Sequence, residues 1–261
     1  MPCKGNSAEI CGGANRLDVY TYGVANSTTG GTVAGKRGLA YNNATLANMF
    51  QGYNQITWGY NWGYPSGGLD SQFEFSPTLW GLPSGADPGW TAAVQTPGTN
   101  HILGFNEPDL SDQADVLPAP ATQGYLTYMQ PFAGTVQIGM PSVLWNRGPP
   151  AGETWDEQFL GNCTGCVLDF AGIHWYQDCV TDWFIGNVTQ AWQVLQKPLW
   201  ITEFQCYGTD AEQASFLQTV IPWLDAQSYV ARYAYFGVFA GYLLDANGTG
   251  LSLAGQAYVS S

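Results

Sequence analysis

Residues 101–109 read HILGFNEPD, an apolar run that ends abruptly in Asn-Glu-Pro-Asp. Because proline cannot donate to a sheet ladder, the strand that this run predicts must end near Glu107. Residues 198–205, PLWITEFQ, have the same form and place Glu203 at the end of a second apolar strand. The sequence thus predicts two carboxylates at the carboxyl ends of two buried strands, and the fold of the chain around them decides whether they meet.

The chain from Lys36 onward alternates short apolar runs with helical or looped stretches. The eight runs are 37–41, 56–60, 73–75, 102–105, 136–140, 170–174, 199–202 and 231–236. Helical patterns lie at 45–51, 122–132, 155–160, 187–196 and 210–226, with a start signal at 209–212 and an interruption signal at Pro222. Residues 81–98 are rich in Gly and Pro and predict little helix.

Eight strands that alternate with helices over roughly 220 residues predict a compact (β/α)8 barrel, the TIM-barrel form of the α/β class. In this count Glu107 ends the fourth strand and Glu203 ends the seventh. Because barrel active sites lie at the carboxyl ends of the strands, both carboxylates should face the same mouth from opposite sides.

The first 35 residues differ from the rest in composition. Residues 11–20, CGGANRLDVY, follow a short cysteine loop and resemble the C-terminal end of a WSC domain, a small disulfide-rich module linked to carbohydrate binding. The alternative is an N-terminal extension that packs on the barrel. We expect a WSC remnant at 1–22, a Gly/Ser/Thr-rich linker at 23–35 and the catalytic barrel at 36–261.

The charge balance restricts the possible partners. Seven Lys and Arg against twenty Asp and Glu give a formal net charge of −13. Nucleic acid and anionic membranes are therefore poor partners, because binding to phosphate rests on basic side chains. No apolar stretch approaches the roughly 18 residues of a membrane span. A neutral polysaccharide is compatible with this surface, and we expect a monomer.

The cysteines and glycosylation sequons indicate a secreted or cell-wall protein whose leader is absent from this sequence. The sequons begin at Asn26, Asn43, Asn162, Asn187 and Asn247. Residues 163–166, CTGC, could form a metal half-site or a redox motif, but a local Cys163–Cys166 disulfide is the better interpretation. Cys179 and Cys206 follow adjacent strands and form a natural second pair, which leaves Cys3 and Cys11 as the third.

The strand-end motifs resemble those of known glycosidases. The segments around Glu107 and Glu203 resemble the acid/base and nucleophile motifs of clan A glycosidases. Together GFNEPD at 104–109, GIHWY at 172–176 and WITEF at 200–204 resemble glycoside hydrolase family 128, the β-1,3-glucanases with a short barrel. The resemblance extends over most of residues 36–258.

The family resemblance implies specific roles. It makes Glu107 the acid/base and Glu203 the nucleophile of a retaining mechanism, with Asn106, His174 and Tyr176 in support. Tyr176 would donate a hydrogen bond to Glu203, and His174 would line the substrate site. The alternatives are ordinary ion pairs or caps for the glutamates and a core position for His174. The other histidine, His101, is interpreted as structural.

Aromatic residues near the strand ends are candidates for stacking on sugar rings. Trp58, Tyr60 and Trp62 alternate along one face of the second strand, and Asn42 follows the first strand and could bond hydroxyls. Other candidates at or just past strand ends are Trp80, Trp145, Trp175 and Tyr207. With two histidines and no Cys/His/Asp cluster of ligand spacing, we expect neither a metal nor another cofactor.

The leading interpretation is a retaining glycoside hydrolase that acts on β-1,3-glucan or its oligosaccharides. The alternatives are the same chemistry on mannan or cellulose, and a barrel that binds glycan without cleaving it. The presence of both Glu107 and Glu203 in their motifs disfavours the binding-only alternative. One departure from clan A is the eighth strand, which has Tyr235-Phe236 where many members have Trp.

Overall fold

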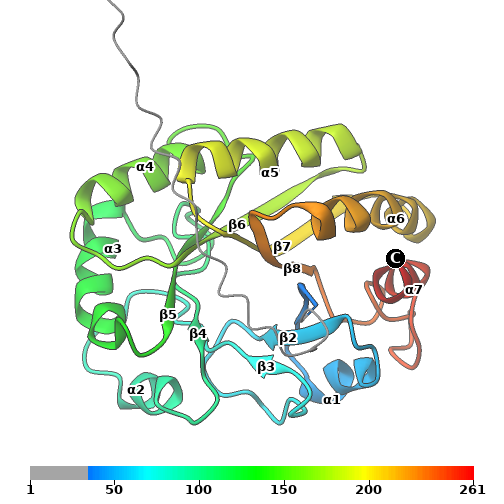
Figure 1. Cartoon of the computed structure of the whole chain (residues 1–261), viewed down its shortest axis with the longest axis horizontal. Helices are drawn as coiled ribbons and strands as arrows, with labels where there is room; N and C mark the ends of the chain where they lie inside the picture. Colours follow the sequence, from blue (N-terminus) through cyan, green and yellow to red (C-terminus); the bar gives the residue numbers. More distant parts are fainter. Residues whose placement is uncertain (1–34) are drawn as a thin grey trace, which may run out of the picture. The chain divides into compact units, whose positions relative to one another are not determined.

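The computed structural model describes residues 35–261 (Figure 1). The expected WSC remnant, almost all of the linker and the Cys3–Cys11 pair lie outside the described residues. Within them the strands are β1 (Arg37–Ala40), β2 (Ile56–Tyr60), β3 (Glu74–Phe75), β4 (His101–Ile102), β5 (Gln137–Leu144), β6 (Phe170–Asp178), β7 (Leu199–Tyr207) and β8 (Val230–Tyr235).

All eight strands form one parallel sheet in the order β3-β2-β1-β8-β7-β6-β5-β4. The two edge strands, β3 and β4, are joined just beyond their ends by a parallel bridge between Thr78 and Leu103. There the Leu79 amide donates to the Leu103 carbonyl at 3.1 Å, and the Leu103 amide donates to the Pro77 carbonyl at 2.9 Å. The predicted (β/α)8 fold is confirmed.

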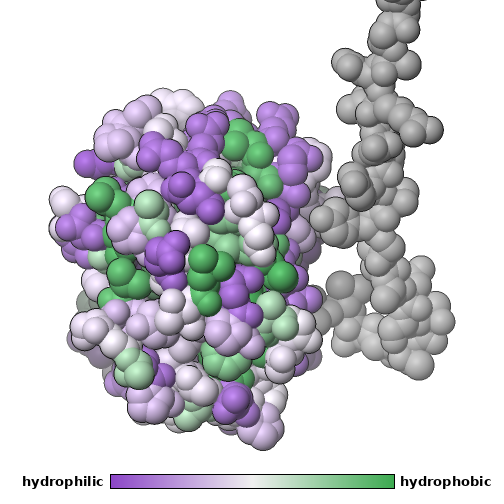
Figure 2. Space-filling model, turned by 90° about the vertical axis from the view of Figure 1, so that its left-hand side faces the viewer, coloured by the Kyte–Doolittle hydropathy of each residue, from purple (hydrophilic) through white to green (hydrophobic). Residues whose placement is uncertain are grey.

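Helices surround the sheet (Figure 1). They are α1 (Ala44–Ala47), α2 (Pro88–Val94), α3 (Pro118–Gly124), α4 (Glu153–Asn162), α5 (Thr181–Leu195), α6 (Asp210–Ala226) and α7 (Leu253–Ser260). Short turns follow α1 and α3: η1 (Asn48–Phe50), η2 (Tyr125–Met129) and η3 (Gln130–Phe132). None of the described helices is long and apolar enough to cross a membrane. Figure 2 shows the face that carries α2, α3 and α4, where hydrophobic residues form small groups between hydrophilic ones.

The structure corrects three helix predictions. The Gly/Pro-rich segment 81–98 contains α2, because Asp87 caps it by accepting from the Trp90 amide at 2.9 Å and Pro88 occupies its first turn. Helix α6 continues through Pro222, which lies on the solvent side while Leu217, Ile221 and Leu224 are buried. Helix α7 was not predicted.

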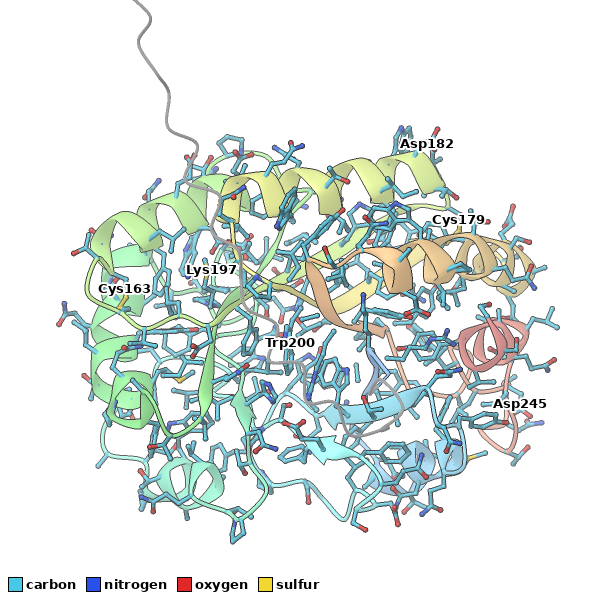
Figure 3. All side chains as sticks on the ribbon, viewed as in Figure 1. Cys163, Cys179, Asp182, Lys197, Trp200 and Asp245 are labelled. Carbon is cyan, nitrogen blue, oxygen red and sulfur yellow. A yellow bond between two sulfur atoms is a disulfide. The ribbon has the colours of Figure 1, made fainter. Side chains whose placement is uncertain are left out.

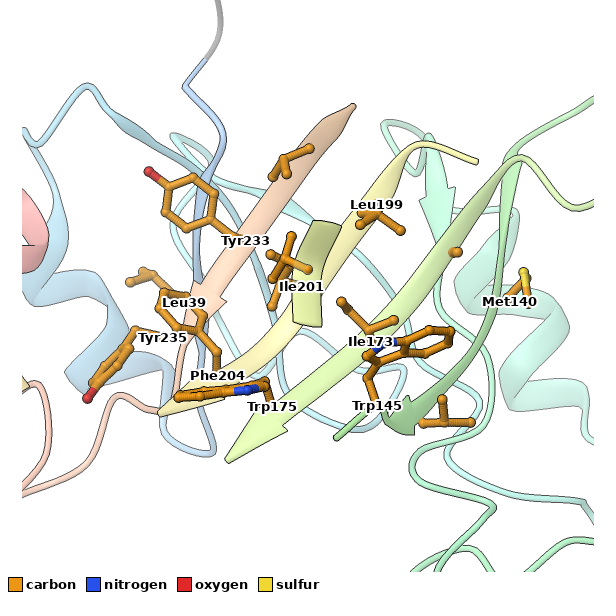
Figure 4. Packing of buried hydrophobic residues seen from close by; sticks show 14 of the residues in the cluster. Leu39, Met140, Trp145, Ile173, Trp175, Leu199, Ile201, Phe204, Tyr233 and Tyr235 are labelled. Atoms are coloured by element: carbon orange, nitrogen blue, oxygen red, sulfur yellow. The ribbon is translucent and has the colours of Figure 1, made fainter. Parts of the chain in front are cut away.

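Two hydrophobic clusters pack against the two faces of the sheet. The larger lies between the sheet and the helices, and the smaller one fills the barrel with residues such as Trp58 and Trp200 (Figures 3 and 4). The Arg232 guanidinium lies 4.4 Å from the Trp200 ring centroid and forms an ion pair with Glu74. Glu74 also contacts His101, Oε1 to Nδ1 at 2.6 Å, so His101 has a structural position as expected.

Asp156 is a fully buried acid in the first turn of α4. Neither carboxyl oxygen has a hydrogen-bond partner among the described residues. Burial, reinforced by the nearby charge of Asp109, raises the pKa of Asp156 well above its ordinary value. The folded protein therefore favours the neutral acid, whereas the unfolded chain ionises near the ordinary pKa of aspartate. As pH rises above that ordinary value, ionisation increasingly favours the unfolded state.

Replacing Asp156 with asparagine should therefore stabilise the protein at neutral pH. We expect the melting temperature at pH 7 to rise by roughly 2–6 °C, or about 1–2 kcal/mol for a domain of this size. Near pH 3.5 the gain should vanish, because aspartate is then neutral in both states. Thermal unfolding followed by circular dichroism from pH 3.5 to 8 checks this, with the exposed Asp182→Asn as control. A destabilised Asp156→Asn at pH 7 would mean that Asp156 is ionised and paired.

Candidate active site

Glu107 lies just beyond β4 in a strained backbone position. The β4 ladder ends at Ile102, earlier than predicted, but a bridge between Asn106 and Ser142 continues the pairing with β5. The Glu107 amide donates to the Ser142 carbonyl at 2.7 Å. Its φ of +41° falls in the left-handed region, which is unusual for a residue other than glycine. The side chain is 8% exposed, so the turn holds a nearly buried carboxylate at the mouth.

Asp109 stabilises the segment that carries Glu107. Its carboxylate accepts hydrogen bonds from the Leu144 amide at 3.2 Å and from the Gly152 amide at 3.0 Å. These contacts connect the Glu107 turn to the end of β5 and to the start of α4. Burial and the nearby Glu107 charge raise the pKa of Asp109 despite the hydrogen bond from Gly152.

Glu203 lies within β7, which continues to Tyr207 instead of ending at Glu203 as predicted. Uncharged donors hold both of its carboxylate oxygens. Trp62 Nε1 donates to Oε1 at 2.7 Å, and the Tyr60 hydroxyl approaches the same oxygen at 3.3 Å. The Tyr176 hydroxyl donates to Oε2, as the family resemblance implied. Burial, followed by the charge of Glu203, raises the pKa of Tyr60 and of Tyr176 well above the usual range. Both phenols therefore stay protonated and act as donors.

His174 connects the two glutamates. Its Nδ1 lies 2.9 Å from Glu107 Oε1, while its Nε2 lies 2.9 Å from Thr202 Oγ1 and 3.5 Å from Glu203 Oε1. The ring is 1% exposed. Burial lowers the pKa of His174, but the Glu203, Glu107 and Asp109 carboxylates outweigh it and raise that pKa above its ordinary value. The imidazolium can then donate to Glu107 and to Thr202, whose hydroxyl lies 3.1 Å from Ser142 Oγ.

One carboxylate oxygen of Glu107, one of Glu203 and one ring nitrogen of His174 all lie within 4.8 Å of one another. The strand count placed the three residues at one mouth, but it did not indicate that they could share a metal ion. Two carboxylates and an imidazole are ligands that a divalent metal accepts. Both ring nitrogens of His174 already have partners among the described residues, so a metal would have to replace the contact with Glu107 or with Thr202.

A cleft of about 580 Å³ opens above the two glutamates. Of the residues predicted to bind substrate, Asn42, Trp62, Trp80 and Tyr207 line it, together with Asn106 and Tyr176. Phe236, where the eighth strand departs from clan A, also lines it, and so do residues that the sequence did not single out: Leu110, Gln113, Leu144 and Phe239. A larger hollow of about 800 Å³ lies beside β3 and α2, but Glu107 and Glu203 are not part of it. We therefore place the site by its chemistry rather than by its size.

Four predicted binding residues do not line the cleft. Trp58 is buried inside the barrel, its ring centroid 4.9 Å from that of Trp200. Trp175 packs on Phe184 of α5 at 5.1 Å, and the indole of Trp145 donates to Gln190 of the same helix, so both face the helices. Tyr60 is also buried, but it contacts Glu203 rather than open space.

The structure contains the two disulfides expected from the sequence in this part of the chain. Cys163 pairs with Cys166 just after α4. Cys179 pairs with Cys206, with 4.7 Å between their Cα atoms, and connects the segment after β6 to β7 three residues beyond Glu203 (Figure 3). The second disulfide therefore joins the two strands that supply Tyr176 and Glu203.

The paired carboxylates agree with a comparison against known families. Residues 38–258 match the family described as glycosyl hydrolase catalytic core. The chain belongs to this family. Alkali-sensitive linkage protein 1 of Schizosaccharomyces pombe is 31% identical to this glycosyl hydrolase core over 251 residues, covering 88% of this chain and 45% of that protein. The chain thus spans about half the length of that relative.

Solved structures of family 128 resemble this glycosyl hydrolase core closely. A curdlan-specific exo-β-1,3-glucanase of subgroup III from Blastomyces gilchristii, in complex with glucose, has a TM-score of 0.79 and 37% identity, covering 87% of this chain and 98% of that one. A subgroup II endo-β-1,3-glucanase from Sorangium cellulosum has a TM-score of 0.76 and 29% identity, with coverage of 86% and 98%.

Proposed function

We propose that the chain is a retaining glycoside hydrolase that cleaves β-1,3-glucan, with Glu107 as acid/base and Glu203 as nucleophile. The observation that carries this proposal is the approach of two nearly buried carboxylates, which have oxygens within 4.8 Å of each other. Retaining enzymes hold these groups about 5–5.5 Å apart, and inverting enzymes about 6.5–9.5 Å apart. The short separation leaves no room for a water between Glu203 and the anomeric carbon.

The surroundings of the two carboxylates support different roles. Glu203 accepts from Trp62, Tyr60 and Tyr176, which favours the ionised form that a nucleophile needs. Among residues 35–261, His174 is the side chain that donates to the Glu107 carboxylate, which leaves Glu107 better placed than Glu203 to exchange a proton with a leaving group. In the first step Glu203 bonds to the anomeric carbon as Glu107 protonates the departing oxygen. In the second, Glu107 takes a proton from water, which attacks that carbon and releases Glu203.

The cleft lining supports a neutral glucan as substrate. Its carboxylates are the proposed catalytic pair, and the rest of the lining is aromatic, aliphatic or amide. The likeness to exo- and endo-β-1,3-glucanases supports the β-1,3 linkage in particular. We also propose that the chain divides at residues 22 and 35 and that the protein is a monomer in an extracellular location. The two disulfides support an oxidising compartment.

The substrate assignment predicts a clear order of activity. The protein should release reducing sugar from curdlan or laminarin at least about tenfold faster than from β-mannan or carboxymethylcellulose, a margin of about 1.4 kcal/mol in transition-state binding. Glu203→Gln is the background control for each substrate. Faster release from mannan or carboxymethylcellulose would contradict the assignment. Binding to curdlan without any release would favour the alternative of a glycan-binding barrel.

A further inference from the structure

Trp62 contacts the proposed nucleophile directly, although its position among aromatic residues suggested a sugar-stacking role. It lies two residues beyond β2, and its indole N–H donates to Glu203 Oε1 at 2.7 Å. We propose that Trp62 is a positioning residue for Glu203, holding one carboxylate oxygen while Tyr176 holds the other. This inference rests on the proposed function, because it assumes that Glu203 attacks the sugar.

The backbone around Trp62 is arranged to aim the indole. Trp62 has a φ of +59°, in the left-handed region that bulky residues avoid. Asn61 fixes this turn by accepting from the Gly63 amide at 3.2 Å and donating to the Pro65 carbonyl at 2.7 Å. The Gly63 carbonyl accepts from the Thr78 amide at 2.9 Å, beyond the end of β3. Strain that the surrounding hydrogen bonds maintain is typical of functional positions.

Aromatic neighbours fix the plane of the indole. The Trp62 ring centroid lies 5.2 Å from that of Tyr60, 5.8 Å from Phe236 and 6.2 Å from Phe239. The two phenylalanines come from the segment after β8, and Tyr60 ends β2. The indole has a single polar hydrogen, and these contacts orient it toward the carboxylate.

The side chains that donate to Glu203 within 3.3 Å are uncharged, and the imidazolium of His174 lies farther away, with Nε2 3.5 Å from Oε1. Among residues 35–261, no Lys or Arg side chain lines the cleft. An arginine bonded to both oxygens would hold the carboxylate but also neutralise much of its charge, whereas an indole and a phenol orient it without adding a charge of their own. Without Trp62, Oε1 would keep the Tyr60 hydroxyl at 3.3 Å, which also donates to the Thr202 carbonyl at 3.0 Å. The carboxylate could then rotate about its Tyr176 contact.

The test removes the N–H and keeps the ring. Trp62→Phe should lower kcat on β-1,3-glucan by roughly 10–100-fold and change KM by less than about threefold, because the lost contact orients the nucleophile rather than the substrate. Trp80→Phe is the matched control: Trp80 lines the same cleft, is 42% exposed and has no side-chain hydrogen bond to Glu203. Its defect should fall on KM rather than on kcat, because Trp80 lines the cleft without holding the nucleophile.

A second variant separates the N–H from the size of the ring. Benzothienylalanine at position 62 replaces the N–H with sulfur and should reproduce the loss of kcat, even if Trp62→Phe folds poorly by circular dichroism. If the wild type cleaves no β-1,3-glucan, the substrate assignment fails, and crystal structures of the wild type and of the variant then test the positioning role without turnover. In the variant the Glu203 carboxylate should keep its contact with Tyr176 and turn away from its wild-type orientation. An unchanged carboxylate orientation, or a defect confined to KM, would make Trp62 a stacking residue and overturn the proposal.

Discussion

Replacing Glu203 with alanine should reduce kcat on β-1,3-glucan by roughly 10⁴–10⁶-fold, the largest loss expected for any single substitution in this chain. The reason is structural: the Glu203 side chain is 6% exposed, donors hold both of its carboxylate oxygens, and one of these oxygens lies within 4.8 Å of a Glu107 carboxylate oxygen, as the proposed mechanism requires. No other described carboxylate shares the cleft with Glu107. Reducing-sugar release on laminarin, followed over days at high enzyme concentration, measures the residual rate.

Two controls show whether the fall in kcat of Glu203→Ala comes only from the removal of the nucleophile. Glu157→Gln makes the matching charge change on the exposed face of α4 and should retain wild-type turnover. With azide and an activated β-glycosyl fluoride, Glu203→Ala should yield an α-glycosyl azide, because the small anion enters the space that the carboxylate leaves. Residual turnover above about 1% of wild type would mean that another group attacks the sugar and that the assignment of Glu203 is wrong.

The position of the two glutamates could be predicted because it depends on local sequence and on one topological rule. Pro108 ends the segment that carries Glu107, and alternating strands and helices place the fourth and seventh strand ends at one mouth. The position of His174 between the carboxylates follows from the same count, since β6 pairs with β7 and His174 lies opposite Glu203 in the register. The contact distances required the structure.

The wrong predictions that Trp58 and Trp175 line the cleft have an identifiable cause. Side chains alternate across a strand, so Trp175, between His174 and Tyr176, had to face the helices once those two residues were placed inside the barrel. The prediction overlooked this constraint. Trp58 does share a face with Trp62, but it enters the barrel four residues earlier and fills the interior instead of the mouth.

The role of Trp62 could not be predicted from periodicity. Its indole reaches Glu203 only because the chain leaves β2 through a left-handed turn, and strand alternation carries no information beyond the strand. Phe239 was missed for a similar reason, because it follows β8 in a long irregular segment before α7. The Asn61-Trp62-Gly63 sequence does contain a turn signal, which could have indicated that the aromatic row ends there.

Replacing Glu107 with alanine should produce a defect that depends on the leaving group. Turnover of β-1,3-glucan should fall by roughly 10²–10⁴-fold, the usual contribution of a general acid, because the departing sugar oxygen needs a proton. A dinitrophenyl glycoside, whose leaving group departs without protonation, should still form the glycosyl-enzyme at close to the wild-type rate. Hydrolysis of that intermediate should then be slow, since Glu107 no longer activates water. The release of dinitrophenol over time should therefore show a fast burst followed by a slow steady state.

Rescue by azide tests whether Glu107 is the acid/base, against reversed roles of the two glutamates or an inverting mechanism. The anion needs no general base, so it should restore the steady-state rate of Glu107→Ala and yield a β-glycosyl azide by attack on the glycosyl-enzyme. His174→Ala removes the side chain that contacts Glu107 but leaves the acid, so azide should give it little rescue. An α-glycosyl azide from Glu107→Ala would instead mean that the two roles are reversed or that the mechanism inverts. Proton NMR of the wild-type reaction checks the same point independently, because a retaining enzyme releases the β-anomer first and an inverting one the α-anomer.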